Sequence, residues 1–258
     1  MKKQPEISEM DKGSSDNFGF YKFVANQHTS SLKKYQDLMI GDYKLLNLIK
    51  FEFLTSFLTY FPGMLGMFLR QKFYRFLFKR QGKGVIIGSG VSLRQPAKIT
   101  IESGSIIDDL VSLSIRGTDK AGIRIGENVF VGRGSILNAR DGLIDIDNYT
   151  SIGSFCRIAT AKGQLRIGRY VLVAAYCYIG GGNHRTDQIN IPMALQDYEN
   201  RGGVVIGDDV WIGAHTIITD GVKIGKGCII GAGSFVNKDI PDYSIAFGCP
   251  AKVQRKRV

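Results

Sequence analysis

Residues 206–240 consist of six-residue units that follow one another in a single unbroken register. Each unit opens with an aliphatic residue, and a small or β-branched residue holds its fifth place. A period of six does not suit an α-helix, which would spread the opening residues around its surface, nor an amphipathic strand, which alternates strictly. It predicts a solenoid of short stacked strands whose coils turn three corners. The opening residues are Ile206, Ile212, Ile218, Ile224, Ile230 and Val236.

Glycine directly follows four of these opening residues, as Gly207, Gly213, Gly225 and Gly231. Because glycine lacks a Cβ, it fits a tight corner where φ is positive or where another backbone approaches closely. Coils stacked at the ~4.7 Å spacing of neighbouring strands would line the interior with the opening residues. One unit is too small to bury anything alone, so the units must stack.

The same pattern extends toward the N-terminus. Short insertions around residues 117–121, 140–142 and 160–163 fall at one corner of successive coils, which supports this register. Residues 180–205 form a much longer insertion, and a loop of that length within a compact repeat is usually functional. The earlier opening residues are Ile87, Leu93, Ile101, Ile107, Leu113, Ile125, Val131, Leu137, Ile146, Ile152, Ile158, Ile167, Val173 and Ile179.

The end of the repeat region makes the pattern more specific. Lys238-Asp239-Ile240-Pro241 closes the hexads, and Gly248-Cys249-Pro250-Ala251-Lys252-Val253 follows. With these motifs, residues 84–258 resemble the left-handed parallel β-helix acyltransferases that use acyl-CoA. The resemblance implies an all-β core formed by a left-handed parallel β-helix (hexapeptide solenoid). Handedness is implied by the resemblance alone, because crossovers between parallel strands are normally right-handed.

Composition divides the chain into four regions. Residues 1–42 form a polar N-terminal arm with few periodic apolar positions, which predicts a flexible or partly ordered segment. Residues 43–83 form a hydrophobic helical segment, and residues 84–240 form the β-helix with its loop at 180–205. Residues 241–258 form a C-terminal cap, which the resemblance identifies as the CoA-binding tail.

The segment 43–83 is dense in Leu and Phe and predicts two helices that break at Pro62-Gly63. Its uncharged run, residues 53–69, is shorter than the ~20 residues that a membrane-spanning helix needs. Its second half is basic without acidic residues, which suits a helix lying in an anionic lipid interface. The same apolar surface would also serve to cover the open first coil or to pack between subunits.

The formal net charge of +11 indicates an anionic partner. No recognition helix or aromatic–basic RNA motif is present, so we do not expect nucleic acid. The N-terminus is not a secretory signal, and we expect a cytoplasmic protein, peripheral on the inner face of the cytoplasmic membrane if residues 43–83 bind lipid. Cys156, Cys177 and Cys228 hold the fifth place of their hexads, where we expect buried thiols rather than disulfides, metal ligands or nucleophiles.

The 180–205 loop contains His184. From the residue alone, a catalytic base and an ordinary loop histidine are equally good interpretations. The resemblance implies the first, with the imidazole taking the acceptor's proton as the acceptor attacks a thioester. Asp187 is a candidate for orienting the imidazole, while a solvated aspartate is the plainer interpretation. His215 is expected at the surface, and the resemblance implies oxyanion donors in the backbone of Gly213-Ala214.

The resemblance also implies a site for acetyl-CoA, whose phosphates need cations and whose pantetheine arm needs a narrow groove. The residues that it places along the cofactor are Trp211, Ala214, Ala232, Asn237, Lys238, Lys252 and Arg255. Family members often have Thr where this chain has Asn237, so a hydroxyl contact is missing there. We expect no metal, because the β-helix region holds two histidines and the zinc carbonic anhydrases of this fold need three.

We therefore predict an acetyl-CoA-dependent O-acetyltransferase that acts on a sugar or lipid-linked glycan in bacterial surface-polysaccharide biosynthesis. The link to polysaccharides rests on analogy with family members that combine a β-helix with a similar apolar segment. N-acylation of an amino sugar and a non-catalytic β-helix scaffold or sugar-binding module are the alternatives. The resemblance further implies a homotrimer, in which the His184 loop of one chain meets the coils of a neighbour.

Overall fold

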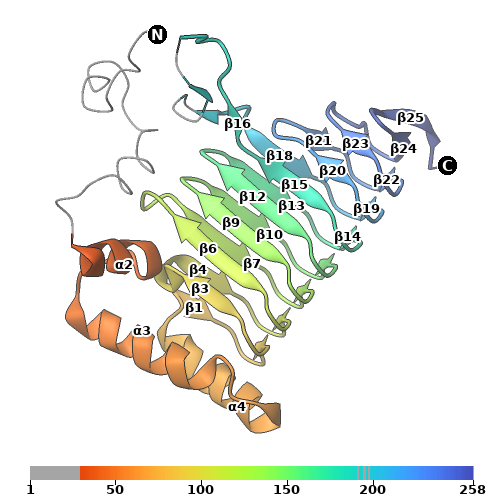
Figure 1. The fold of residues 1–258 in the computed structure, drawn as a ribbon. Coiled ribbons are helices and arrows are strands. Elements are labelled where there is room, and N and C mark those ends of the chain that lie inside the picture. Colours follow the sequence, from red (N-terminus) through yellow and green to blue (C-terminus); the bar gives the residue numbers. More distant parts are fainter. Residues whose placement is uncertain (1–29, 191, 194–195, 197, 258) are drawn as a thin grey trace.

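The computed structural model describes residues 30–190, 192–193, 196 and 198–257, and shows a parallel β-solenoid with helices at its N-terminal end (Figure 1). Three parallel sheets run along the solenoid. Each coil passes from sheet A to sheet B to sheet C and then returns to sheet A one rung higher. The predicted all-β core with a preceding helical segment is confirmed.

The strands are short, as a coil with three sides requires. Sheet A contains β1 (Arg80–Gln81), β4 (Ile99–Ile101), β7 (Gly122–Ile125), β10 (Leu143–Ile146), β13 (Gln164–Ile167), β18 (Gly203–Ile206) and β21 (Lys223–Ile224). Sheet B contains β2 (Ile86–Ile87), β5 (Ile106–Ile107), β8 (Phe130–Val131), β11 (Ser151–Ile152), β14 (Leu172–Val173), β19 (Trp211–Ile212), β22 (Ile229–Ile230), β24 (Ser244–Gly248) and β25 (Ala251–Lys256). Sheet C contains β3 (Ser92–Arg94), β6 (Ser112–Arg116), β9 (Ile136–Arg140), β12 (Arg157–Ala161), β15 (Tyr178–Gly181), β20 (Ile217–Ile218) and β23 (Phe235–Val236).

Strand pairing confirms the predicted register. In sheet C, Leu137 pairs with Ile158, and Ile158 pairs with Ile179. The opening residues of sheets A and B stack in the same way, and these side chains are buried. Because side chains alternate along a strand, the residues on either side of each opening residue point outward. The core is therefore a column of aliphatic residues, and chemistry must lie on the outer faces and corners.

The glycines that follow the opening residues are required by close packing rather than by backbone conformation. A Cβ at Gly213 would lie 2.5 Å from the backbone nitrogen of Ala232, in the coil above. Positive φ instead falls two residues later in the hexad, at Asp209 (57°) and His215 (58°). Of the two reasons for glycine at these places, close backbone approach is the one that applies.

Three helices precede the solenoid: α2 (Ser31–Met39), α3 (Leu45–Leu58) and α4 (Gly63–Phe73), followed by a 3-10 turn, η1 (Tyr74–Phe76). A second 3-10 turn, η2 (Pro96–Lys98), follows β3. The break between α3 and α4 falls at Pro62, the N-cap of α4, as predicted. Figure 1 shows the helices at the first-coil end of the solenoid.

A buried arginine fastens the α3–α4 hairpin to the first coil. The Arg70 guanidinium donates hydrogen bonds to the backbone oxygens of Ile87 (2.9 Å), Leu58 (3.0 Å) and Phe61 (2.8 Å). Buried side chains of α3 and of the segment that follows α4 join the core of the solenoid; they are Phe51, Leu54, Leu58, Tyr74, Leu77 and Phe78. The hairpin therefore covers the open end of the solenoid, which is one of the roles considered for residues 43–83.

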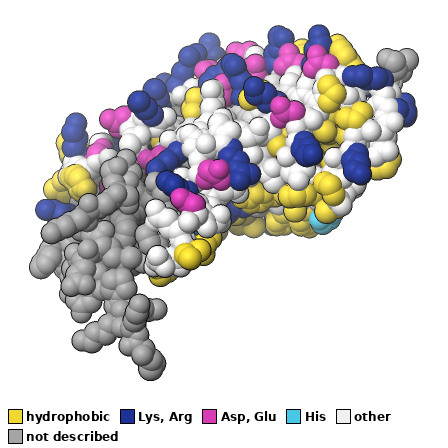
Figure 2. Space-filling view, turned by 90° about the horizontal axis from the view of Figure 1, so that it is seen from above, with side chains coloured by type: hydrophobic (Ala, Val, Ile, Leu, Met, Phe, Trp, Pro, Cys, Tyr) yellow, Lys and Arg dark blue, Asp and Glu magenta, His cyan; other side chains and the backbone are white. Residues whose placement is uncertain are grey.

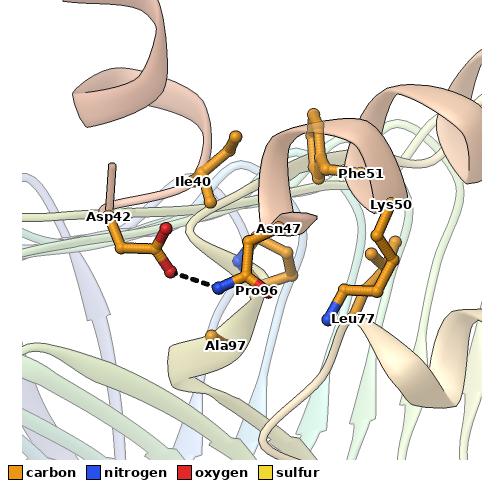
Figure 3. A pocket seen from close by; sticks show the side chains of 8 residues that line it. All are labelled: Ile40, Asp42, Asn47, Lys50, Phe51, Leu77, Pro96 and Ala97. Atoms are coloured by element: carbon orange, nitrogen blue, oxygen red, sulfur yellow. Dashed lines mark hydrogen bonds between the residues drawn. The ribbon is translucent and has the colours of Figure 1, made fainter. Parts of the chain in front are cut away.

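A small pocket of about 50 Å³ lies where α3 meets the first coil. In Figure 3, the Asn47 amide donates a hydrogen bond of 2.6 Å to the Asp42 carboxylate, with Phe51 and Leu77 nearby. Its lining contains no histidine or cysteine. We assign this pocket to the packing of the junction.

The two ends of the solenoid extend beyond the predicted limits. Helix α2 lies within the predicted arm 1–42, of which residues 1–29 are outside the described residues. Strand β1 pairs with β4 before residue 84, and β24 continues sheet B beyond residue 240. Strand β25 then folds back antiparallel to β24.

Among the described helices, none combines the length and apolar character needed to cross a bilayer.

Candidate active site

The loop 180–205 leaves the solenoid at the end of β15, at the corner between sheets C and A. Its two ends pair as a short antiparallel ribbon, β16 (Asn183–His184) and β17 (Tyr198–Glu199), in which His184 lies opposite Tyr198. Figure 1 shows this ribbon projecting from the side of the stacked coils. The ribbon holds His184 half-buried at the edge of sheet C.

A backbone carbonyl determines which nitrogen of His184 carries the proton. Nδ1 of His184 lies 3.3 Å from the backbone oxygen of Gln196. Since a carbonyl oxygen only accepts, Nδ1 must be the donor in this hydrogen bond, and Nε2 then keeps its lone pair. The side chain of Gln196 is itself buried and donates to the backbone oxygen of Gln188 (2.8 Å). The loop thus holds an imidazole with Nε2 ready to accept a proton.

Tyr198 and Arg140 hold the other side of the imidazole. The rings of His184 and Tyr198 pack with centroids 4.3 Å apart. Arg140, the last residue of β9, places its guanidinium 4.7 Å from the centre of the Tyr198 ring and donates to the Tyr198 hydroxyl at 2.8 Å. His184 is therefore connected through Tyr198 to the rigid outer face of sheet C.

A cavity of about 280 Å³ lies beside His184 on the outer face of sheet C. Its lining combines small residues with two arginines and two tyrosines. The lining residues are Asn138, Arg140, Arg157, Ala159, Thr160, Ala161, Tyr178, Gly181, Gly182, His184 and Tyr198. Small side chains on the floor leave space for a substrate, and the histidine at its edge can exchange a proton with it.

Asp187 is engaged by a neighbouring arginine rather than by His184. Arg185 donates two hydrogen bonds to its carboxylate, at 3.0 and 2.6 Å. The bond from Arg185 lowers the pKa of Asp187 below its usual range. Asp187 is exposed, and the structure does not bring it onto the imidazole.

The two candidate oxyanion donors differ in availability. The Gly213 N–H donates to the backbone oxygen of Ile230 (2.8 Å) and is used in the stacking of the coils. The Ala214 N–H has no hydrogen-bond acceptor within the described part of the chain. Of the two groups, Ala214 is therefore the one that can donate to a ligand.

The residues implied for the cofactor fall into separate groups. Ala214 and Ala232 lie on successive coils at the corner between sheets B and C, where the Gly233 N–H donates to the Ala214 oxygen (2.8 Å). Trp211, on the neighbouring strand β19, is 54% exposed. Asn237 and Lys238 follow β23 at the opposite corner, and Lys252 and Arg255 are exposed on β25.

Within one chain, His184 and the corner at Ala214 do not meet. Strands β15 and β20 are parallel neighbours in sheet C. His184 follows β15, whereas Ala214 precedes β20, so the two lie at opposite ends of the sheet C strands. A site that uses both residues needs a second copy of the chain.

His215 and the buried cysteines occupy the positions expected for them. His215 is exposed at the corner between sheets B and C, and its ring stacks on Tyr176 with centroids 5.0 Å apart. Cys156, Cys177 and Cys228 are free and buried. The contact with Cys177 and burial both raise the pKa of the Cys156 thiol, which makes it a poor nucleophile. No metal-binding cluster of His, Cys, Asp and Glu occurs among the described residues.

Sequence reasoning missed three residues that surround His184: Gln196, Tyr198 and Arg140. Gln196 and Tyr198 lie in a segment without periodicity, and Arg140 was read as part of a short insertion. Arg140 could have been found from its place in the repeat. It ends a strand of the β-helix and points outward, toward the corner that carries the long loop.

Comparison with known proteins agrees with the fold. Residues 203–238 match the model of the bacterial transferase hexapeptide family (six repeats). This segment contains β18 to β23 and begins after the ribbon that pairs His184 with Tyr198.

The similar curated proteins are acetyltransferases. A probable acetyltransferase of Mycobacterium tuberculosis is 37% identical over 137 residues, which is 53% of this chain and 45% of the relative. A chloramphenicol acetyltransferase of Klebsiella aerogenes is 35% identical over 117 residues, which is 44% of this chain and 53% of the relative. The chain thus spans about half the length of these relatives. These matches and the repeat support a hexapeptide-repeat acyltransferase.

Solved structures share the solenoid at low sequence identity. The N-acyltransferase AntD from Bacillus cereus, in complex with dTDP and 3-hydroxybutyryl-CoA, is 21% identical with a TM-score of 0.53, covering 73% of this chain and 88% of that chain. The polySia-specific acetyltransferase NeuO is 23% identical with a TM-score of 0.51, covering 69% and 79%. These similarities establish the fold.

Proposed function

We propose that this protein transfers an acetyl group from acetyl-CoA to a hydroxyl of a sugar, with His184 as general base. The observation that carries the proposal is the hydrogen bond between Nδ1 of His184 and the Gln196 carbonyl, beside a cavity of about 280 Å³. Acetyltransferases among the similar proteins support the reaction class.

In this mechanism Nε2 of His184 removes the proton of the acceptor hydroxyl as its oxygen attacks the thioester carbonyl carbon. The new C–O bond produces a tetrahedral oxyanion, which the Ala214 N–H of a neighbouring chain stabilises. When the C–S bond breaks, the imidazolium returns its proton to the thiolate of CoA. A positioned base of this kind typically contributes ~10²–10⁴ in rate.

The donor site follows from the small-residue corner and the cationic tail. Ala214 and Ala232 leave room for the pantetheine arm, Trp211 flanks it, and Lys252 and Arg255 face the phosphates. Asn237 and Lys238 follow β23 at the opposite end of the sheet C strands, so they would join this site from a neighbouring chain. The AntD structure contains 3-hydroxybutyryl-CoA, which supports an acyl-CoA donor here.

We propose a homotrimer, as the family resemblance implies, and the geometry of one chain supports a site shared between copies. His184 and Ala214 lie at opposite ends of the sheet C strands, so placing the His184 loop of one chain beside the Ala214 corner of a neighbour would unite them. Sedimentation equilibrium should give three times the chain mass of 28.5 kDa. A monomer with full activity would disprove the shared site.

The α3–α4 hairpin supports peripheral contact with the cytoplasmic face of a membrane. Its outer side exposes large apolar side chains, including Leu46 (80%), Phe57 (64%) and Met64 (80%). Lys72, in the last turn of α4, and Arg75, in η1, are exposed and follow this apolar hairpin in the chain. An apolar face with flanking cations fits an anionic lipid interface. A lipid-linked glycan acceptor in surface-polysaccharide biosynthesis would account for this contact.

Product analysis tests the reaction. Incubation with acetyl-CoA and a panel of sugars and amino sugars should release the CoA thiol and yield a product heavier by one acetyl group. Mild base removes an O-acetyl ester and leaves an N-acetyl amide. Loss of the acetyl group in mild base therefore shows transfer to a hydroxyl, and its retention shows transfer to an amine. Failure to release thiol above hydrolysis with any glycan, including lipid-linked glycans, would favour the non-catalytic scaffold.

A further inference from the structure

The outer face of sheet C forms a trough with a floor of small side chains. Outward positions in the middle of its strands carry Ser114, Asn138 and Ala159 on successive coils, in direct register. The next outward position carries Ala161 above Arg140. The cavity beside His184 occupies the part of this trough from β9 to β15.

Arginines line both sides of this trough. Arg157 begins β12 on one side, and its side chain is exposed without a hydrogen bond or ion pair in the described part of the chain. Arg140 lies on the other side and is bound to Tyr198. Arg116 is directly below Arg140 in the register, and burial together with the Arg140 charge lowers the pKa of Arg116. Lys and Arg side chains are also spread over the surface in Figure 2.

Carboxylates near the trough act on Arg116, which lies outside the cavity lining: the charges of Asp37 and Asp141 oppose the lowering of its pKa. None of the residues that line the cavity is acidic. Asp187 and Glu199, which line the adjoining loop pocket, are each paired with an arginine of the loop, Arg185 and Arg201. Asp141, which follows Arg140, accepts a hydrogen bond from the Thr118 N–H (3.1 Å). The cavity therefore presents positive charge beside the imidazole.

We propose that the acceptor is an anionic sugar, whose carboxylate or phosphate group is held by Arg157 and Arg140 while its hydroxyl lies at His184. This inference rests on the proposed function and narrows its substrate class. The planar guanidinium of arginine matches a carboxylate or phosphate with two parallel hydrogen bonds, which gives orientation as well as affinity.

Binding measurements with matched pairs of sugars test the proposal independently of turnover. The probes are the methyl glycosides of galacturonic acid and of sialic acid, each compared with its own methyl ester, and glucose 1-phosphate compared with glucose. At least one charged form should bind the wild-type protein roughly tenfold more tightly than its neutral partner, since hydrogen bonds to charged groups are the stronger ones. The preference should weaken as salt is raised.

Substitution of Arg157 then tests whether its guanidinium causes the preference for anionic sugars. Arg157→Gln should remove the preference for the charged form and leave binding of the neutral form unchanged, while Arg157→Lys should restore part of the preference. Arg166→Gln is the matched control, because Arg166 is a similarly exposed arginine on sheet A. It should bind both forms as the wild type does.

Three outcomes would overturn the proposal: no preference for any charged form, a preference that survives Arg157→Gln, or an equal loss in Arg166→Gln. Acetyl-CoA binding is measured on the same proteins. If acetyl-CoA binds and is consumed with neutral sugars alone, the proposed function stands and the anionic acceptor is wrong. If acetyl-CoA does not bind, the proposed function itself fails.

Discussion

The stacked coils and the 180–205 loop are held together in different ways. Within the stack of coils, an opening residue pairs with an equivalent residue above and another below, as Ile158 does with Ile179 and Leu137. In the loop, each contact occurs once: Gln196 to His184, and Tyr198 to Arg140. The comparison teaches that repetition supplies stability, whereas the irregular insertion supplies a particular arrangement of polar groups.

This difference predicts that substitutions in the two regions have separable effects. A change in the column of aliphatic residues should lower stability through a cavity. A change in the loop should lower turnover and leave stability nearly unchanged, because the loop side chains lie outside the column.

The largest effect is expected for His184→Ala. Loss of the general base should reduce kcat by about 10²–10⁴, because that is the contribution of a positioned base. The melting temperature should stay within about 2 °C of wild type, a shift that corresponds to a fraction of a kcal/mol. Steady-state kinetics and thermal unfolding on one preparation measure both quantities. His215→Ala is the control, and turnover retained in His184→Ala would remove His184 from the mechanism.

The next effect is on stability. Ile179→Ala should lower the free energy of unfolding by about 2–5 kcal/mol, since it leaves a cavity in a fully buried position. Urea unfolding measures this change. Ile189→Ala is the matched control, because Ile189 lies in the loop and is 94% exposed. Equal destabilisation by the two substitutions would contradict the division between column and loop.

A smaller effect is expected at Tyr198. Tyr198→Phe keeps the ring against His184 and removes the hydroxyl that accepts from Arg140, so kcat should fall about fivefold, the value of one ordinary hydrogen bond. Tyr198→Ala also removes the ring contact, so its kcat should fall about tenfold or more. Single-turnover rates at saturating acetyl-CoA measure both variants. An unchanged rate in Tyr198→Ala would show that this contact does not position the imidazole.

The smallest effect is expected for Asp187→Asn. Asp187 is paired with Arg185, which lowers the pKa of the carboxyl group. The carboxylate is therefore charged at neutral pH, and its negative charge is lost only when the pH falls through the lowered pKa. Turnover between pH 6 and 9 should change by less than about threefold. A loss of a hundredfold would mean that Asp187 moves onto His184 when substrates bind.

The solenoid could be predicted in detail from the sequence because many successive hexads each indicate the same coil. The openers from Ile87 to Val236, the corner that carries the insertions, and the break at Pro62 are all found in the structure. Helix α2 was not predicted because its residues are polar and its contacts come from distant positions in the sequence, such as the Gln95 side-chain amide, which donates to the Asp37 backbone oxygen (2.9 Å).

The site could be predicted only in part. His184 stood out because it lies in a long insertion, but its partners Gln196 and Tyr198 follow no periodic pattern. The Asp187 pairing depended on the loop conformation, which favours a neighbour two residues away. The use of the Gly213 N–H in coil stacking followed from register, since every residue at that place donates to the coil above.

We propose that the corner of small residues at Ala214 binds acetyl-CoA. His184 serves the reaction as general base and does not contribute to the affinity for acetyl-CoA. Isothermal titration of acetyl-CoA into wild-type protein and His184→Ala tests this most directly. We expect micromolar binding in both proteins, with affinities within a few fold of each other. Absence of binding by the wild type at millimolar acetyl-CoA would contradict it.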